Sequence, residues 1–272
     1  MFEFTELDYQ ETPLGAISLR RRSEPRLGSK VLYEVKLGEE FLMSSLFVEA
    51  EEELATLALQ SLNAEELDVV VGGLGLGYTA AEALENEAVR SLLVIETIAP
   101  VISWHRLGLV PLGDKLALDS RCSLVHGDFF KLAASSDGFD PDNPGSLFHA
   151  VLVDIDHSPS HWLNTDNSAF YTEGGITALA ASLHPGGIFG LWSNDPPDEA
   201  TLKQLRAALD CPVIGMIRTK EAPYQENGLE TASEEELIDA IARFPILLER
   251  PIVVNGHRAA IGRPPENVID IL

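Results

Sequence analysis

Residues 67–77 read LDVVVGGLGLG, and residues 91–96 read SLLVIE. The first stretch is a short apolar strand that runs into closely spaced glycines, and residues 79–84 after it have helical character. The second stretch is another apolar strand, and it ends in the carboxylate of Glu96. A strand, a helix and a second strand in this order predict a βαβ unit.

Further apolar runs repeat this pattern along the chain, at residues 122–125, 148–153 and 187–192. Helix-like segments separate them, notably residues 171–183. Continuous apolar strands that alternate with helices are typical of a parallel sheet covered on both faces. The sequence therefore predicts an α/β fold with a Rossmann-like, doubly wound sheet.

The flanking regions differ from this central part. Residues 16–19 and 31–37 predict a small N-terminal β-hairpin, and the period becomes helical from Glu49. Near the other end, Ser233 and Glu236 form a capping-box pattern for a helix through residue 241. Asn255-Gly256 then predicts the turn of a hairpin formed by residues 251–254 and 258–261. We expect this tail to be too small for a core of its own.

These patterns divide the chain into three expected parts. Residues 1–48 form the N-terminal β region, residues 49–210 the Rossmann-like domain, and residues 211–272 a helix followed by a β-hairpin.

The composition limits the partners and the compartment. Nineteen Lys and Arg against 43 Asp and Glu give a net charge of −24, which repels nucleic acid and anionic membranes. Two cysteines, Cys122 and Cys211, are too few for a disulfide framework or a four-cysteine metal site, so we expect no metal. We see neither a signal peptide nor a membrane-spanning stretch, and we expect a cytoplasmic protein.

Candidate ligand-binding residues follow successive strands. Gly73, Gly75 and Gly77 allow a tight turn and a close approach of the backbone to a ligand. Glu96 ends the next strand, where a carboxylate can accept both hydroxyls of a ribose, and Asp128 follows a third strand, where it can reach the amine of an adenine. The GxGxG spacing does not favour a dinucleotide, and an adenosine ligand without phosphates suits the acidic chain better. The alternative is a structural turn with solvated acids nearby.

A fourth strand end carries Asp154, Asp156 and His157. Asp154 could serve as a general base or as an anchor for an amine, and His157 could relay a proton. Alternatively, Asp156 and Ser158 only cap the next segment. We interpret residues 195–197, Asp-Pro-Pro, as a turn.

Several of these motifs together resemble a known family. Residues 7–15 (LDYQETPLG), 72–77 (GGLGLG), 94–96 (VIE), 126–128 (HGD) and 153–159 (VDIDHSP) are similar to those of spermidine synthase-like proteins with the class I S-adenosylmethionine-binding fold. The resemblance covers about residues 7–209. It implies S-adenosylmethionine or its decarboxylated form as co-substrate, with Glu96 on the ribose, Asp128 on the adenine and Asp154 as the first acid of the gate motif. This family holds the amine of its donor with an Asp in the glycine loop, where this chain has Gly75.

The tail resembles a second family. Residues 216–224 (MIRTKEAPY), 244–254 (FPILLERPIVV) and 262–266 (GRPPE) are similar to the C-terminal half of glutaredoxin-linked arsenate reductases, which have a thioredoxin-like fold. The resemblance implies that Arg218, Arg250 and Arg263 correspond to the arginines that bind the oxyanion. Neither cysteine of this chain stands where that family has its nucleophile.

The sequence thus favours a group transferase that uses one of these sulfonium donors and acts on an amine or polyamine, which an acidic pocket would attract. A catalytically silent adenosyl-binding or scaffold protein is the first alternative. An arsenate reductase-like oxidoreductase without its nucleophilic Cys is the second. The oligomeric state stays open, with a homodimer as one candidate.

Overall fold

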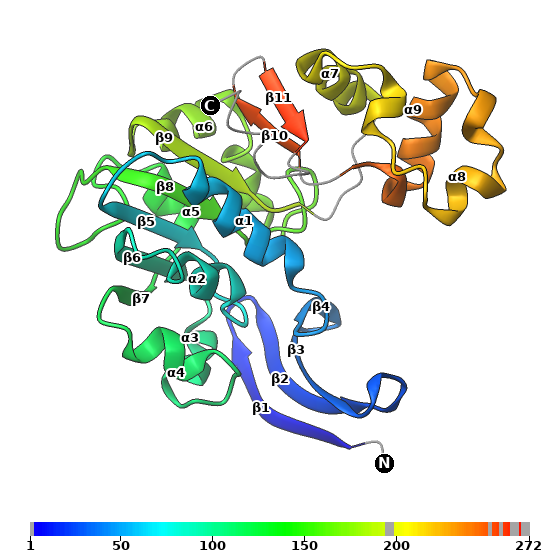
Figure 1. Ribbon diagram of the computed structural model, residues 1–272. Helices are drawn as coiled ribbons and strands as arrows, with labels where there is room; N and C mark the ends of the chain where they lie inside the picture. Colours follow the sequence, from blue (N-terminus) through cyan, green and yellow to red (C-terminus); the bar gives the residue numbers. More distant parts are fainter. Residues whose placement is uncertain (1–2, 194–198, 250–251, 256–257, 262–266, 268–272) are drawn as a thin grey trace. The chain divides into compact units, whose positions relative to one another are not determined.

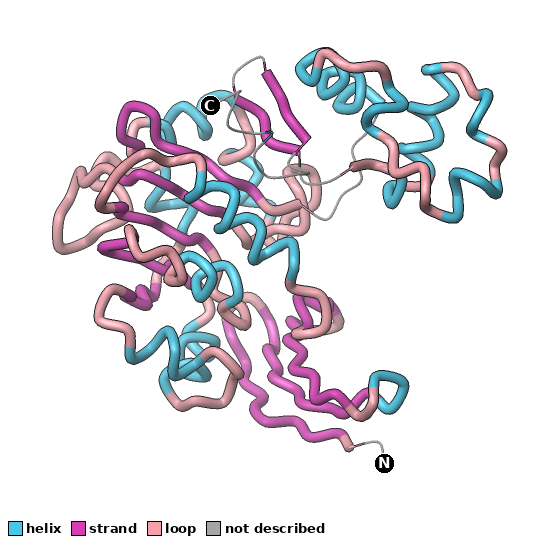
Figure 2. The backbone as a smooth tube through the Cα atoms, in the orientation of Figure 1, coloured by secondary structure: helices cyan, strands magenta, loops and turns pink. Residues whose placement is uncertain are grey.

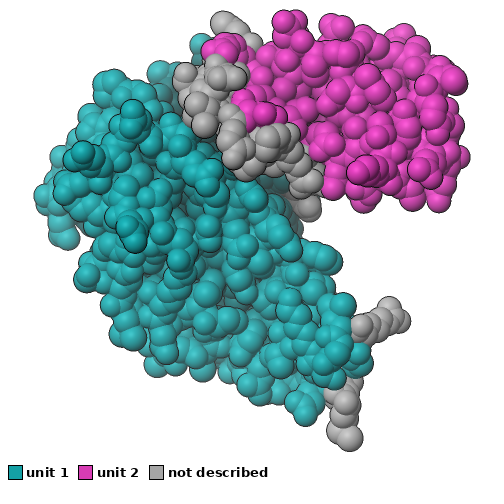
Figure 3. Space-filling model, in the orientation of Figure 1, with its two compact units in different colours: residues 1–193 teal, residues 194–272 magenta. Residues whose placement is uncertain are grey.

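A computed structural model describes residues 3–193, 199–249, 252–255, 258–261 and 267 of the chain. Two compact units make up the molecule: unit 1 comprises residues 1–193 and unit 2 residues 194–272 (Figure 3).

The centre of unit 1 is a parallel sheet with the strand order β7-β6-β5-β8-β9 (Figure 1). The bounds are β5 Leu67–Gly72, β6 Val89–Glu96, β7 Cys122–His126, β8 Phe148–Val153 and β9 Leu183–Leu191. The chain runs from β5 outward to β6 and β7, and it then returns to the other side of β5 for β8 and β9. This reversal of strand order places a topological switch point at the carboxyl ends of β5 and β8, where such sheets bind ligands.

Both faces of the sheet are buried, as the continuous apolar strands predicted. Val69 and Val71 of β5 belong to one core, and Val70 between them belongs to the other, because successive strand residues point to opposite faces. The first core also holds residues of the helices α1 Glu49–Gln60, α2 Tyr78–Ala83, α3 Ala99–Arg106 and α4 Gly113–Leu118. The second holds residues of α5 Phe129–Ala133 and α6 Glu173–Ala180, together with Phe170, which follows the 3-10 helix at Thr165–Ala169. The doubly wound α/β architecture is confirmed.

The N-terminal β region is larger than the predicted hairpin. Four antiparallel strands lie in the order β1-β2-β3-β4, with a 3-10 turn at Pro25–Leu27. Their bounds are β1 Phe4–Thr12, β2 Gly15–Glu24, β3 Lys30–Leu37 and β4 Glu40–Ser44. The predicted pair is present as β2 and β3. The sequence pattern missed β1 because most of its side chains are exposed, and most of them are polar, so it lacks an apolar face.

Unit 2 is mainly helical (Figure 2). Its elements are α7 Glu199–Leu209, α8 Ala222–Glu226, α9 Glu234–Arg243, the 3-10 turns Val213–Met216, Leu229–Thr231 and Pro245–Leu247, and the hairpin β10 Ile252–Asn255 with β11 Arg258–Ile261. Leu202, Met216, Ile241 and Leu247 lie at the centre of a buried cluster. The expectation that the tail lacks a core was therefore wrong, because helix α7 and the 3-10 turns add apolar residues that the sequence pattern did not assign to it.

Local predictions in both units need small corrections. The capping box of α9 is confirmed, with Ser233 and Glu236 each accepting from the other's backbone amide. Asn255 pairs with Arg258 as the last residue of β10, so it is a strand residue and not a central residue of the turn, as was predicted from Asn255-Gly256. Helix α6 ends at residue 180, and Leu183 already begins β9. Along the described residues, none of the helices combines the length and apolar character needed to cross a bilayer.

Candidate functional site

The predicted ligand residues follow four neighbouring strands of the parallel sheet. Asp128 follows β7, Glu96 ends β6, the glycine loop follows β5, and Asp154 follows β8. Since these strands are parallel and adjacent, their carboxyl ends lie in that order along one edge of the sheet. The fold therefore brings together the residues that the sequence analysis selected from widely separated positions.

The glycine loop requires its glycines for packing against the protein. Gly73, Gly75 and Gly77 have positive φ values of 93°, 47° and 92°, a region that favours glycine. A Cβ atom at Gly73 would lie 2.0 Å from the carbonyl oxygen of Asp154. A Cβ atom at Gly77 would lie 2.6 Å from Leu116 Cδ1. The loop thus joins the ends of β5 and β8 closely, and a side chain at Gly73 would separate them.

Glu96 holds this loop from the end of the neighbouring strand. Its Oε2 accepts from the Leu74 amide at 3.0 Å, and its Oε1 accepts from the Ile98 amide at 2.8 Å. The Gly75 and Thr97 amides also favour the charged form of the carboxylate. Burial raises the pKa of Glu96, although these amides act in the opposite direction. Glu96 therefore connects the glycine loop to the end of β6. Its predicted contact with ribose hydroxyls stays a prediction.

Two residues that the sequence analysis missed lie against the glycine loop. His105 of α3 is fully buried and its Nε2 lies 3.0 Å from the Gly75 carbonyl oxygen, to which it must donate because a carbonyl only accepts. Burial lowers the pKa of His105. Met43 of β4 places its sulfur 2.9 Å from the Leu76 amide nitrogen. Sequence reasoning could not find either residue, since only the fold brings them to the loop.

Asp128 lies beside an apolar cavity of about 260 Å³. Its side chain caps helix α5 by accepting from the Lys131 amide at 3.2 Å, and it forms an ion pair with Lys131 Nζ at 2.9 Å. Val125, Leu132 and Pro141 contribute to the cavity lining. A largely apolar cavity with a carboxylate at its rim has the chemistry to hold a flat heterocycle that carries an amine.

A pair of acids with raised pKa values lies in unit 1. Burial raises the pKa of Asp154 to about 6, while Thr79 Oγ1 donates to its Oδ2 at 3.0 Å. Glu51, in the first turn of α1, is 8% exposed, and burial together with the Asp154 charge raises its pKa to about 7. Among the described residues, no lysine or arginine is a main influence that would lower the pKa of Asp154 or Glu51. Two carboxyl groups with raised pKa values and little counter-charge create a site that favours a cation.

Asp156 and His157 occupy different environments from Asp154. Asp156 accepts hydrogen bonds from the Leu163 amide at 2.8 Å, from Asn167 Nδ2 at 2.9 Å and from Tyr171 OH at 3.0 Å. It thereby holds the segment after β8 in place. His157 Nε2 lies 2.9 Å from Glu40 Oε1, at the beginning of β4. Their predicted catalytic roles stay predictions.

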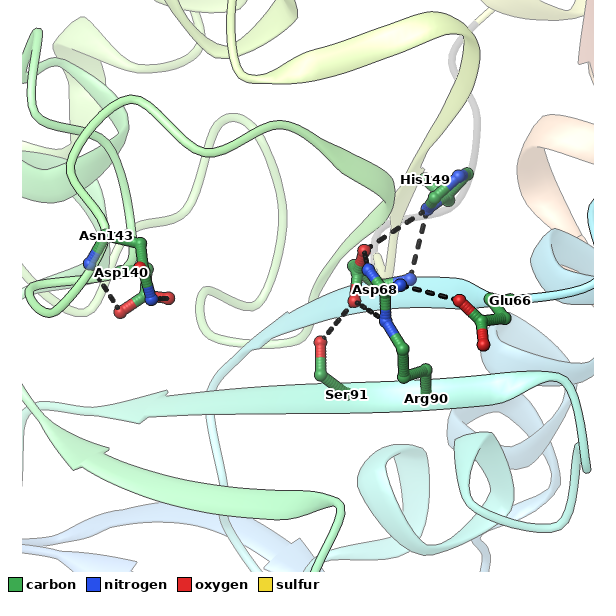
Figure 4. Close-up of polar contacts among 7 residues, drawn as sticks. All are labelled: Glu66, Asp68, Arg90, Ser91, Asp140, Asn143 and His149. Carbon is green, nitrogen blue, oxygen red and sulfur yellow. Dashed lines mark hydrogen bonds and ion pairs between the residues drawn. The ribbon is translucent and has the colours of Figure 1, made fainter.

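A second polar cluster lies at the opposite end of the strands (Figure 4). Arg90 forms ion pairs with Glu66 and Asp68, and Ser91 Oγ donates to Asp68 at 2.6 Å. The Asp68 amide donates to His149 Nδ1 at 3.1 Å. Asp140 and Asn143, also drawn there, form their own pair at 3.0 Å. The cluster around Asp68 lies at the amino ends of β5, β6 and β8, and its polar groups pair with one another. We therefore assign it a structural role.

Of the three arginines predicted to bind an oxyanion, the structure describes Arg218. Arg218 forms an ion pair with Glu221 at 3.2 Å. Arg250 and Arg263 lie outside the residues that the structure describes. Burial raises the pKa of Cys211, and it raises that of Cys122 in unit 1 to about 12, so both thiols are stabilised in the protonated form. Within the described part of the chain, His, Cys, Asp and Glu side chains do not form a group of three that could hold a metal.

Solved structures similar to this chain include two spermidine synthases. One is in complex with the transition-state analogue AdoDATO (18% identity, TM-score 0.55), and it aligns with 70% of this chain and 59% of its own. The other, from Thermotoga maritima (17% identity, TM-score 0.51), aligns with 68% and 55%. The chain thus spans less than two thirds of either structure. At these identities the similarity establishes the fold, which is the class I methyltransferase type predicted above.

Sequence comparison identifies the C-terminal part. An arsenate reductase from Rhizobium meliloti is 34% identical over 124 residues, which are 45% of this chain and 82% of the relative. The ArsC family matches residues 176–271. This match begins in α6, well before residues 216–266, which carry the predicted resemblance. Both predicted resemblances are confirmed. Through residues 176–271 the chain belongs to the ArsC family.

Proposed function

We propose that this protein is a group transferase that uses S-adenosylmethionine or its decarboxylated form and acts on an amine. The observation that carries the proposal is the acid pair of half-buried Asp154, which follows β8, and buried Glu51, whose pKa the Asp154 charge raises further. Spermidine synthases share the fold of unit 1, which supports the proposal, while the substrates assigned to this chain are our inference.

The acid pair provides for binding and activating the acceptor. A protonated amine enters as the missing counter-charge and donates to both carboxylates. Asp154, with a pKa of about 6, is suited to accept a proton near neutral pH. The amine nitrogen, freed of a proton, attacks a carbon attached to the donor sulfonium. The carbon–sulfur bond breaks, its electron pair stays on sulfur, and the products are a neutral thioether and the alkylated amine.

The donor fits the order of the strand ends. Asp128 and its apolar cavity would hold the adenine, Glu96 the ribose hydroxyls, and the glycine loop the sulfonium end, which leaves the reacting carbon near Asp154. The loop amides at Gly73, Leu74 and Gly77 already donate to oxygens of the protein, so the loop is unsuited to cradle phosphates. This favours a nucleoside without phosphates, as the acidic composition predicted.

Calorimetric titration of the full chain with both donors tests the proposal. We expect binding of at least one donor, and Glu96→Ala should weaken it by about 1 to 3 kcal/mol because the hydrogen bonds to the ribose and to the Leu74 amide of the glycine loop are lost. A matched control is Glu53→Gln, an exposed acid on α1. The absence of binding by both donors would refute the transferase.

The first alternative is a protein that binds the donor without turnover. It is favoured by Gly75, which supplies no carboxylate where the spermidine synthase-like family holds the donor amine. Detection of any alkylated amine would exclude it.

We propose no arsenate reductase activity for this chain. Reduction requires a thiolate nucleophile. Burial stabilises the protonated thiols of Cys122 and Cys211 instead. Arg218 and its partners would then bind an oxyanion at most.

A further inference from the structure

The backbone of Asp154 is fixed at the end of β8. Its amide donates to the Gly72 carbonyl at 2.8 Å, which continues the parallel pairing of β8 with β5 by one residue. Its own carbonyl packs directly against Gly73. With the backbone held on both sides, the place of the Asp154 carboxyl group depends on the contacts of its side chain.

Thr79 of α2 holds this carboxyl group. Its Oγ1 donates to Asp154 Oδ2 at 3.0 Å, although the two residues are 75 positions apart in the chain. Thr79 is 3% exposed, so its hydroxyl is largely shielded from water and needs an acceptor within the protein. A branched side chain has few rotamers, and burial fixes the one that directs the hydroxyl to Asp154. The contact occupies one oxygen of the carboxylate and leaves the other for a ligand.

The same hydrogen bond sets the order in which the two acids of the pair ionise. A donor to a carboxylate favours its charged form, and Thr79 lowers the pKa of Asp154 against the larger effect of burial. For Glu51 the opposing hydrogen bond comes from its own backbone amide. As the pH rises, Asp154 therefore loses its proton before Glu51, at pKa values of about 6 and about 7.

The other titratable groups around the pair belong to α1 and α2. They are Glu49, Glu52 and Tyr78. The charges of the two glutamates raise the pKa of Glu51, and burial raises that of the tyrosine, which stays neutral. Asp156 and His157 follow Asp154 in the chain, but their side chains contact other segments, as described above. Removing the Thr79 hydroxyl therefore changes the support of Asp154 and leaves every charge around the pair in place.

We propose that Thr79 is a positioning residue of the transferase, whose hydroxyl holds the Asp154 carboxylate in place to accept the proton of the amine. This inference rests on the proposed function. The ammonium group of the acceptor contacts the carboxylate oxygen that Thr79 leaves free and gives its proton to it. The nitrogen lone pair that this step releases then attacks the donor carbon. Glu51 contributes the second acid, which balances the charge of the ammonium group on binding.

The test is the pH dependence of kcat/KM, measured with a linear diamine and the donor that gives product. Thr79→Val keeps the branched shape and removes the hydroxyl, so the acid limb should move up by about one pH unit. Thr79→Ser retains a hydroxyl and should restore the profile of the unaltered chain. The matched control is Thr56→Val: Thr56 Oγ1 of α1 donates to Glu82 Oε1 at 2.9 Å, and the loss of this threonine–carboxylate bond should leave the acid limb in place.

The outcomes separate this inference from the proposed function. If product forms and the acid limb of Thr79→Val does not move, or moves as much in Thr56→Val, the role of Thr79 is wrong and the transferase stands. The same holds if Thr79→Ser behaves like Thr79→Val. If the unaltered chain forms no product, both fall. Should Thr79→Val fail to fold, Thr79→Ala removes the same hydroxyl and is compared with Thr79→Ser in its place.

Discussion

Replacing Glu51 by Gln should stabilise unit 1 at alkaline pH and leave it unchanged at acid pH. The folded chain raises the pKa of Glu51 from 4.5 to about 7. The folded state binds this proton more tightly than the unfolded state. Ionisation of Glu51 therefore does not lower the free energy of unfolding below pH 4.5, and it lowers it by the full amount above pH 7. At about 1.4 kcal/mol per pH unit, that cost is about 3 kcal/mol. Gln removes the charge and therefore the cost.

Urea unfolding followed by tryptophan fluorescence measures this effect. The three tryptophans, Trp104, Trp162 and Trp192, all lie in unit 1, so the signal reports on that unit. At pH 8 we expect Glu51→Gln to be about 2 to 3 kcal/mol more stable than the unaltered chain, and at pH 4 nearly equal to it. Glu53→Gln, on the exposed side of the same helix, should change stability by less than about 0.5 kcal/mol at either pH. An equal change at both pH values, or a loss of stability at pH 8, would refute the reasoning.

Other substitutions test separate contacts. Gly73→Ala should cost more than about 2 kcal/mol in the same assay, because its Cβ would meet the Asp154 carbonyl and the backbone has positive φ; an unchanged midpoint would contradict this. Asp156→Ala should accelerate amide hydrogen exchange at Leu163, which loses its acceptor, and unaltered protection would remove the structural role of Asp156. Ser233→Ala should destabilise α9 by about 1 kcal/mol, measured by exchange of its amides; no change would mean that the cap is unimportant. Glutaredoxin-coupled arsenate assays should give no turnover, and turnover lost in Cys211→Ser would overturn that expectation.

The sheet could be predicted from the sequence because its strands carry their own signal. Residues 69–72 are apolar on both faces, and the glycines after them permit the turn into α2. Strand β1 could not be predicted, since its mostly polar side chains show no apolar face. Its extended structure depends on the antiparallel pairing with β2. Helix α6 and strand β9 share an apolar run, and only the parallel pairing with β8 places the start of the strand at Leu183.

The candidate site divides in the same way. Glu96, Asp128 and Asp154 could be predicted because each follows an apolar strand at the same edge. Glu51 stands in a run of acids at the start of α1, and nothing local separates it from Glu49, Glu52 or Glu53; only packing buries it near Asp154. Met43 lies 33 residues before Leu76, whose amide it contacts. Contacts of this kind depend on tertiary structure alone.

The most direct test of the central claim is to detect the transferred group. The full chain is incubated with a linear diamine and either donor, and the amine is analysed by mass spectrometry. We predict an amine that has gained a methyl or an aminopropyl group, with a rate that falls at least about 100-fold in Asp154→Asn because the proton acceptor is lost. The account would be contradicted if neither donor yields an alkylated amine, or if Asp154→Asn forms the product as fast as the unaltered chain.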